Sequence, residues 1–137
     1  MSPRSRRRGA TLLVFTCAAS AGAHAGLVPA HLNGEPRLGA AFVIAVVLLV
    51  AAAIAVAARP EDRPITSATG LLLACLMLAY LASLTTGIPV LDPDPEALDA
   101  VGIATNAFQA LGVLVALWLI HPLGRPARLT HLQEASQ

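Results

Sequence analysis

The sequence contains no lysine, and charged and aromatic residues of every kind are scarce. Charged side chains make up 12% of the 137 residues and aromatic side chains 4%, whereas hydrophobic residues make up 56%. Soluble globular domains carry about 25% charged residues, so this composition excludes an ordinary soluble domain and indicates an integral membrane protein. The absence of lysine beside abundant alanine and arginine is typical of a high-GC bacterial gene. We therefore predict a bacterial membrane protein with the lipid bilayer as its surroundings and no nucleic-acid partner.

Cysteine is scarce as well, and the motifs of common enzymes are missing. Cys17 and Cys75 both lie in apolar runs, where a single cysteine is usually a small buried hydrophobic residue rather than part of a disulfide framework. There is no methionine cluster for copper(I), no glycine-rich phosphate loop and no HExxH motif. We therefore predict no catalytic residues and expect that the protein is not an enzyme.

Four apolar stretches follow one another along the chain, and each is long enough for the roughly 20 helical residues that cross a bilayer. The sequence therefore predicts an all-α bundle of four transmembrane helices with short loops. The expected spans are residues 10–28, 38–58, 65–87 and 100–120 of a single membrane domain, 10–122, between a basic head, 1–9, and a tail, 123–137.

The first span raises two questions. Pro29 lacks a backbone donor, so the helix is expected to kink or end near Val28, with residues 29–37 as a short external turn. The basic head, the short apolar core and an Ala-His-Ala site at residues 23–25 also describe a cleavable signal peptide. The GxxxG spacing of Gly22 and Gly26 is typical of helices that pack closely, and it favours retention of the span.

Arginine is distributed unevenly among the segments that join the spans. Eight of the nine arginines lie in the head, the second connector and the tail, and only Arg37 lies in the other two loops. Basic loops of membrane proteins stay in the cytoplasm. We therefore predict a multi-pass protein of the bacterial cytoplasmic membrane with both termini in the cytoplasm.

With this orientation, uncharged polar residues collect in the outer half of the bundle. Tyr80 lies near the outer end of the third span, and Asn106 and Gln109 are three residues apart on one face of the fourth. Polar side chains at this depth are unfavourable when they face lipid, so we expect them to face each other or a wet cavity. His24, near the outer end of the first span, is expected to bond to Asn106, Gln109 or a backbone carbonyl.

Two histidines and a carboxylate lie within a dozen residues of one another. His24, His31 and Glu35 could bind Cu(II) or Zn(II) at the outer surface, with help from the acidic loop that contains Asp92, Asp94, Glu96 and Asp99. Their intervals match no established ligand spacing, and the alternative is that His24 bonds within the bundle while His31 and Glu35 are solvated. Haem is not expected, because His24 and His121 lie at opposite surfaces and bis-histidine ligation needs two imidazoles at one depth.

The first third of the chain carries a distinctive set of residues between positions 24 and 42. Its members are His24, Pro29, His31, Leu32, Glu35, Pro36, Leu38, Gly39 and Phe42. The pattern resembles a motif of small uncharacterised four-helix membrane proteins of high-GC Gram-positive (actinobacterial) bacteria. In one respect it departs from that motif, because Ala30 stands where the family has an acidic residue, and this weakens a metal site at the turn. The resemblance implies that the first span is retained, and it implies no activity.

These features favour an accessory or interaction subunit of a larger membrane complex or a homo-oligomer. The small-residue stripes Ala18-Gly22-Gly26 and Gly112-Ala116 suit helix association within the bundle or with a partner. The alternative is an externally facing metal-binding or metal-delivery protein that uses the two histidines and the glutamate. An oligomeric channel or transporter subunit comes third, since the spans contain no charge for an ion pathway.

Overall fold

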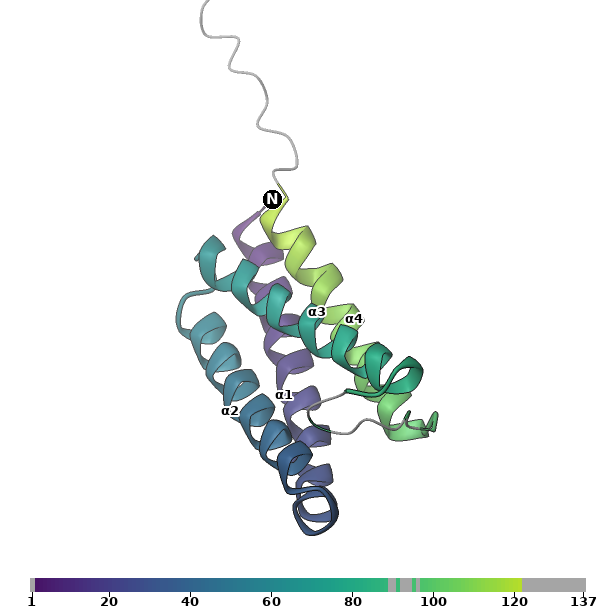
Figure 1. The fold of residues 1–137 in the computed structure, drawn as a ribbon. Coiled ribbons are helices and arrows are strands. Elements are labelled where there is room, and N and C mark those ends of the chain that lie inside the picture. The colour runs from purple at the N-terminus through teal and green to yellow at the C-terminus, as the bar shows by residue number, and fades with distance from the viewer. Residues whose placement is uncertain (1, 89–90, 92–94, 96, 122–137) are drawn as a thin grey trace, which may run out of the picture.

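The computed structural model describes residues 2–88, 91, 95 and 97–121. Its four helices are α1 (Pro3–Gly34), α2 (Pro36–Ala58), α3 (Arg63–Thr85) and α4 (Ala100–Ile120) (Figure 1). Each helix is long and apolar enough to cross a membrane. The predicted all-α architecture with four candidate spans is therefore confirmed, and it is that of a multi-pass helical membrane protein.

Local sequence explains where the helices begin. Proline occupies the first turn of three helices, as Pro3, Pro36 and Pro64. A backbone N–H in the first turn has no intrahelical partner, so a residue that lacks this N–H costs the helix no hydrogen bond there. The Asp62 carboxylate caps α3 by accepting from the Ile65 backbone N–H at 3.1 Å. The Asp99 carboxylate caps α4 in the same way, accepting from the Gly102 N–H at 2.8 Å. The prolines and acidic residues of the connectors thus mark the helix starts.

α1 is longer than the predicted first span at both ends. It begins at Pro3, within the basic head, and runs through Pro29 to Gly34, so that Glu35 alone separates it from α2. The helix does not end near Val28, and the predicted turn over 29–37 is wrong. At about 1.5 Å per residue, its 32 residues span roughly 48 Å, well beyond the ~30 Å of a hydrocarbon core.

Contacts with α2 explain why the helix continues past Pro29. A proline removes only one bond of the helical ladder, and the turn that follows it is fixed by its neighbours. The His31 ring packs against the Phe42 ring with centroids 4.8 Å apart. Gly39 approaches so closely that a Cβ built on it would lie 2.7 Å from the backbone nitrogen of Leu32. Packing between the two helices therefore outweighs the local preference of proline.

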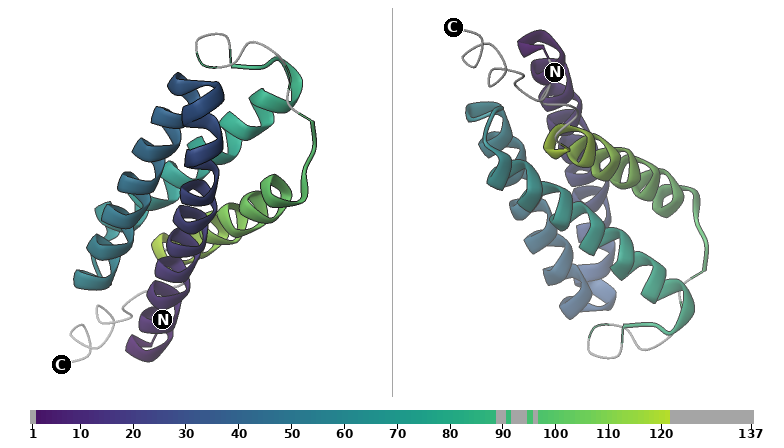
Figure 2. Two further views of the ribbon diagram at one scale, coloured as in Figure 1. Left: turned by 90° about the horizontal axis from the view of Figure 1, so that it is seen from below. Right: turned by 90° about the horizontal axis from the view of Figure 1, so that it is seen from above.

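α1 is the central helix of the bundle. It packs most extensively against α2 and also packs against α4, which in turn packs against α3. α2 also packs against α3, less extensively than in any of these three pairs, and Figure 2 shows the arrangement from two sides. Leu13 and Cys17 of α1 meet Leu49, Leu73 and Leu119 in a fully buried core. Many large apolar side chains remain exposed on the outside of the bundle, as expected for helices that face lipid.

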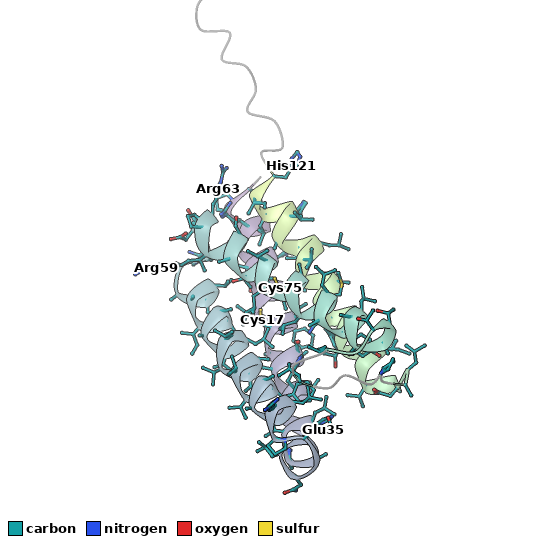
Figure 3. The ribbon with its side chains drawn as sticks, viewed as in Figure 1. Cys17, Glu35, Arg59, Arg63, Cys75 and His121 are labelled. Carbon is teal, nitrogen blue, oxygen red and sulfur yellow. The ribbon has the colours of Figure 1, made fainter. Side chains whose placement is uncertain are left out.

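The two ends of the bundle differ in charge. Arg6 donates through Nη2 to the Glu61 carbonyl at 2.9 Å and through Nη1 to the Leu119 carbonyl at 3.5 Å. These bonds tie the start of α1 to the α2–α3 connector and to the end of α4. Arg63 lies at this arginine-rich end and Glu35 at the opposite end (Figure 3). The fold therefore gathers basic residues of the head and the second connector at one end, and the orientation relative to the cytoplasm remains a prediction.

Candidate functional site

A cavity of about 340 Å³ lies between the helices towards the Glu35 end. All four helices line it, together with residues of the α3–α4 connector. Most of its surface is apolar, and its polar lining residues are His24, His31, Tyr80, Ser83, Asp99, Thr105, Asn106 and Gln109. A mainly apolar cavity of this size with a few convergent polar groups is typical of a small-molecule site. The structure thus brings the two N-terminal histidines and the polar residues of α3 and α4 to one place.

Both histidines make the same kind of bond within α1. His24 Nδ1 lies 2.8 Å from the Ser20 carbonyl oxygen, and His31 Nδ1 lies 2.9 Å from the Leu27 carbonyl oxygen. A carbonyl oxygen only accepts, so each Nδ1 carries a proton and each Nε2 keeps a lone pair when the ring is neutral. A backbone carbonyl is one of the partners predicted for His24. Each imidazole therefore has its Nε2 left to accept a hydrogen bond.

Phe42 of α2 holds the two imidazoles in place. Its ring makes edge-to-face contacts with His24, at a centroid distance of 5.6 Å and an angle of 73°, and with His31, at 4.8 Å and 82°. The two histidines are seven residues, about two helical turns, apart on α1. Their relative position is therefore set by α1 and by one aromatic ring.

In each of the two side-chain amides of α4, the nitrogen makes a hydrogen bond and the oxygen does not. Gln109, 1% exposed, donates through Nε2 to Ser20 Oγ at 3.1 Å, and Asn106 donates through Nδ2 to the Gly102 carbonyl at 3.0 Å. Asn106 Oδ1, Gln109 Oε1 and the Tyr80 hydroxyl are buried and have no hydrogen-bond partner among the described residues. Buried polar atoms are normally paired. Of the four unpaired buried side-chain atoms found among the described residues, three belong to residues that line this one cavity.

The three residues predicted as metal ligands are not assembled into one set. Glu35 is exposed at the junction of α1 and α2 (Figure 3), whereas His24 and His31 line the cavity. Within the described ranges, no three histidine, cysteine, aspartate or glutamate side chains gather closely enough to hold a metal ion. Three of the acidic loop residues considered as further ligands, Asp92, Asp94 and Glu96, lie outside the described residues.

His121 lies far from the cavity. It ends α4 at the arginine-rich end of the bundle, opposite Glu35 (Figure 3). His24 and His31 line the cavity towards the Glu35 end. The separation of His24 and His121 that argued against a shared haem iron is therefore present in the fold.

Gly22 and Gly26 do not pack against another helix of the chain. Both lie on an exposed face of α1, and a Cβ added at either position meets nothing within 4 Å. Close packing occurs instead at Gly112 of α4, where a Cβ would lie 2.5 Å from Leu73 Cδ1 and 2.8 Å from Thr16 Oγ1. The Gly112 stripe therefore serves the bundle itself, and the α1 stripe is exposed to lipid or to a partner.

Sequence reasoning gave no role in the site to Ser20 or Gly102, and it placed Phe42 only in the family motif. Ser20 could have been found, because it precedes His24 by four residues and so shares its helical face. Nothing in the sequence pairs Phe42 with the histidines or Gly102 with Tyr80, since these contacts join different helices.

Comparisons with protein-family models, curated proteins and solved structures find no match to this chain. The resemblance of its first third to small actinobacterial membrane proteins remains a prediction.

Proposed function

We propose that this protein binds a small amphipathic molecule in the cavity between its four helices. The observation that carries the proposal is the convergence of three buried, unpaired polar atoms, from Tyr80, Asn106 and Gln109, on one mainly apolar cavity. An unpaired buried oxygen lowers stability by roughly 1–3 kcal/mol. A ligand that supplies the missing partners recovers this free energy, and the apolar lining accommodates its hydrocarbon part.

The proposed location is the outer half of the bacterial cytoplasmic membrane. The arginines of the head and the second connector lie at the end of the bundle opposite Glu35, and basic segments remain in the cytoplasm. Both termini are then cytoplasmic, and the cavity faces the extracytoplasmic side. A ligand can reach it from that side or from the outer leaflet.

A pair of matched substitutions on α2 tests binding in the cavity. Ala45 is buried and lines the cavity, whereas Ala51 is exposed on the outside of the same helix. Titration of the protein in lipid nanodiscs with 1-hexanol should shift the methyl resonances of Leu38 and Leu76, two lining residues, with saturation at one ligand per chain. Ala45→Phe should abolish the saturable shift and Ala51→Phe should preserve it. Shifts that rise linearly in all three proteins would mean partition into lipid and would contradict the proposal.

A second candidate function, association with a second copy of this chain, is supported by the exposed small-residue face of α1. Ala18, Gly22 and Gly26 lie on it, and no other described part of the chain covers the two glycines. Small residues four apart let two membrane helices approach closely. In this role the protein is an interaction subunit of a homo-oligomer or of a larger complex.

Disulfide cross-linking tests this second candidate. The exposed Cys75 is first replaced by alanine, and cysteine is then placed at Gly22 or, as a control on another lipid-facing surface, at Ala51. Gly22→Cys should give a covalent dimer under mild oxidation in membranes, and Ala51→Cys should not. Equal yields at both positions would indicate random collision, and no dimer at Gly22 would exclude this face as a contact between copies.

A further inference from the structure

The polar atoms that remain unpaired at the cavity are mostly hydrogen-bond acceptors. The Asn106 amide has a fixed orientation, because Nδ2 donates to the Gly102 carbonyl at 3.0 Å and a carbonyl oxygen cannot donate in return. The oxygen Oδ1 is therefore the atom left without a partner. Gln109 Oε1 also has no partner among the described residues while its Nε2 donates to Ser20 Oγ. Each amide nitrogen keeps a second N–H, so the free groups are mostly, but not all, acceptors.

The histidines and the acidic residue of the cavity add further acceptors. His24 and His31 use Nδ1–H within α1, so the neutral rings have only Nε2 lone pairs to offer. Asp99 also lines the cavity, and its ionised carboxylate only accepts. The Tyr80 hydroxyl has no partner in the described ranges, and it can donate or accept. No arginine occurs among the lining residues in the part of the chain that the structure describes.

A site built from acceptors selects a ligand that donates. Resting on the proposed binding function, we infer that the ligand is an amphipathic primary amine, whose ammonium head supplies three N–H donors and whose hydrocarbon part lies against apolar residues such as Leu76. Its positive charge complements the carboxylate of Asp99, and the cavity is also lined by the aromatic residues Phe42 and Tyr80, a residue type that attracts cations. A carboxylate or phosphate head offers acceptors to a site in which most free groups are also acceptors, and it is disfavoured.

Four probes with one hexyl chain separate the contributions of donors and charge. Hexylamine carries charge and donors, 1-hexanol carries one donor without charge, trimethylhexylammonium carries charge without donors, and 1-methoxyhexane only accepts. Their dissociation constants are measured by NMR titration in nanodiscs, with empty nanodiscs as the partition control. We expect hexylamine to bind at least about tenfold more tightly than trimethylhexylammonium or 1-methoxyhexane, as one or two added hydrogen bonds predict, with 1-hexanol between them.

The outcomes separate this inference from the proposed function. If none of the four probes binds in a saturable way, the proposed function fails. If the probes bind with equal affinity, or the ether or trimethylhexylammonium binds most tightly, the cavity does bind small molecules but the inference of a donating amine is overturned.

Substitution of Asn106 links the preference to one atom. Asn106→Leu removes Oδ1 at similar volume and should reduce the hexylamine advantage over trimethylhexylammonium about tenfold. Asn106→Asp retains acceptors and should preserve that advantage, so it keeps the test decisive if the leucine variant folds poorly. Thr85→Val is the control, because the Thr85 hydroxyl is exposed at the same end of the bundle and bonds only to backbone carbonyls of α3. An unchanged hexylamine advantage in Asn106→Leu would overturn the inference.

Discussion

Gln109 of α4 and Ser20 of α1 are joined by a 3.1 Å hydrogen bond, and both side chains are at most 1% exposed. Within the described residues it is the one hydrogen bond between two side chains. Because Ser20 also accepts from His24 through its carbonyl, this residue connects the α1 histidine with the α4 amide.

A double-mutant cycle of Ser20→Ala and Gln109→Leu should show that this bond stabilises the bundle. We expect a coupling energy of about 0.6 kcal/mol, the average for hydrogen bonds between membrane helices, and no more than about 1.7 kcal/mol. Ser20→Ala alone should destabilise, since it leaves the Gln109 amide with no partner. The free energy of unfolding of the unsubstituted protein, the two single variants and the double variant is measured by reversible unfolding in detergent mixtures. If the changes in unfolding free energy caused by the two substitutions are strictly additive, the hydrogen bond contributes nothing to stability.

Gly39→Ala should weaken the contact between α1 and α2. The added methyl would lie 2.7 Å from the backbone nitrogen of Leu32, and backbone cannot move aside as a flexible side chain can. Overpacking of this kind destabilises by about 1–3 kcal/mol. Gly34→Ala is the matched control, because a Cβ there meets nothing within 4 Å. It should be neutral or stabilise slightly, by up to about 1 kcal/mol, as alanine favours helix. A Gly39→Ala protein as stable as the Gly34→Ala protein would contradict the packing described.

Labelling of single added cysteines should reveal the orientation. Glu35 and Glu61 are exposed and belong to opposite ends of the bundle. A membrane-impermeant maleimide should label Glu35→Cys in intact cells and should label Glu61→Cys only after permeabilisation, because the basic end stays in the cytoplasm. The unsubstituted protein gives the background from Cys17 and Cys75. Labelling of Glu61→Cys alone in intact cells would reverse the proposed orientation.

The metal hypothesis predicts a different result from the ligand proposal. Zn(II) and Cu(II) sites normally need three or four protein ligands, and Glu35 does not line the cavity with His24 and His31. We therefore expect calorimetric titration with either ion to show no stoichiometric binding. Binding of one ion per chain that weakens at least tenfold in His31→Ala would instead establish the site predicted from the sequence.

The sequence predicts the four helices well because the responsible signals are local. Long apolar runs favour spanning helices, and Asp62, Asp99 and the connector prolines start helices through their own backbones. Pro29 is the exception. Its local effect is to break a helix, but the contacts of His31 with Phe42 and of Leu32 with Gly39 come from α2 and are invisible in the local sequence.

The sequence predicts which polar residues lie at one depth in the membrane, but it does not predict which of them contact one another. Positive charge distribution and span lengths placed His24, Tyr80, Asn106 and Gln109 in the same half of the bundle, and the structure has all four around one cavity. Their partners depend on the rotation of each helix about its axis. Nearly uniform apolar surfaces do not specify that rotation, which is why the sequence left open whether Gly22 packs within the bundle or against a partner, whereas in the structure it faces outward.

The single-residue connector at Glu35 limits how a ligand can enter the cavity. With so short a link, α1 and α2 stay together as a hairpin, and the cavity can open where α2 meets α3 without loss of the packing of α1 against α4. α2 packs less extensively against α3 than α1 packs against α2 or α4 packs against α3. Spin labels on α2 and α3 should therefore report a distance that changes with hexylamine, while a pair on α1 and α2 reports a constant one. We therefore expect a ligand to enter the cavity laterally, between α2 and α3, from the acyl-chain region of the membrane in which it is already dissolved.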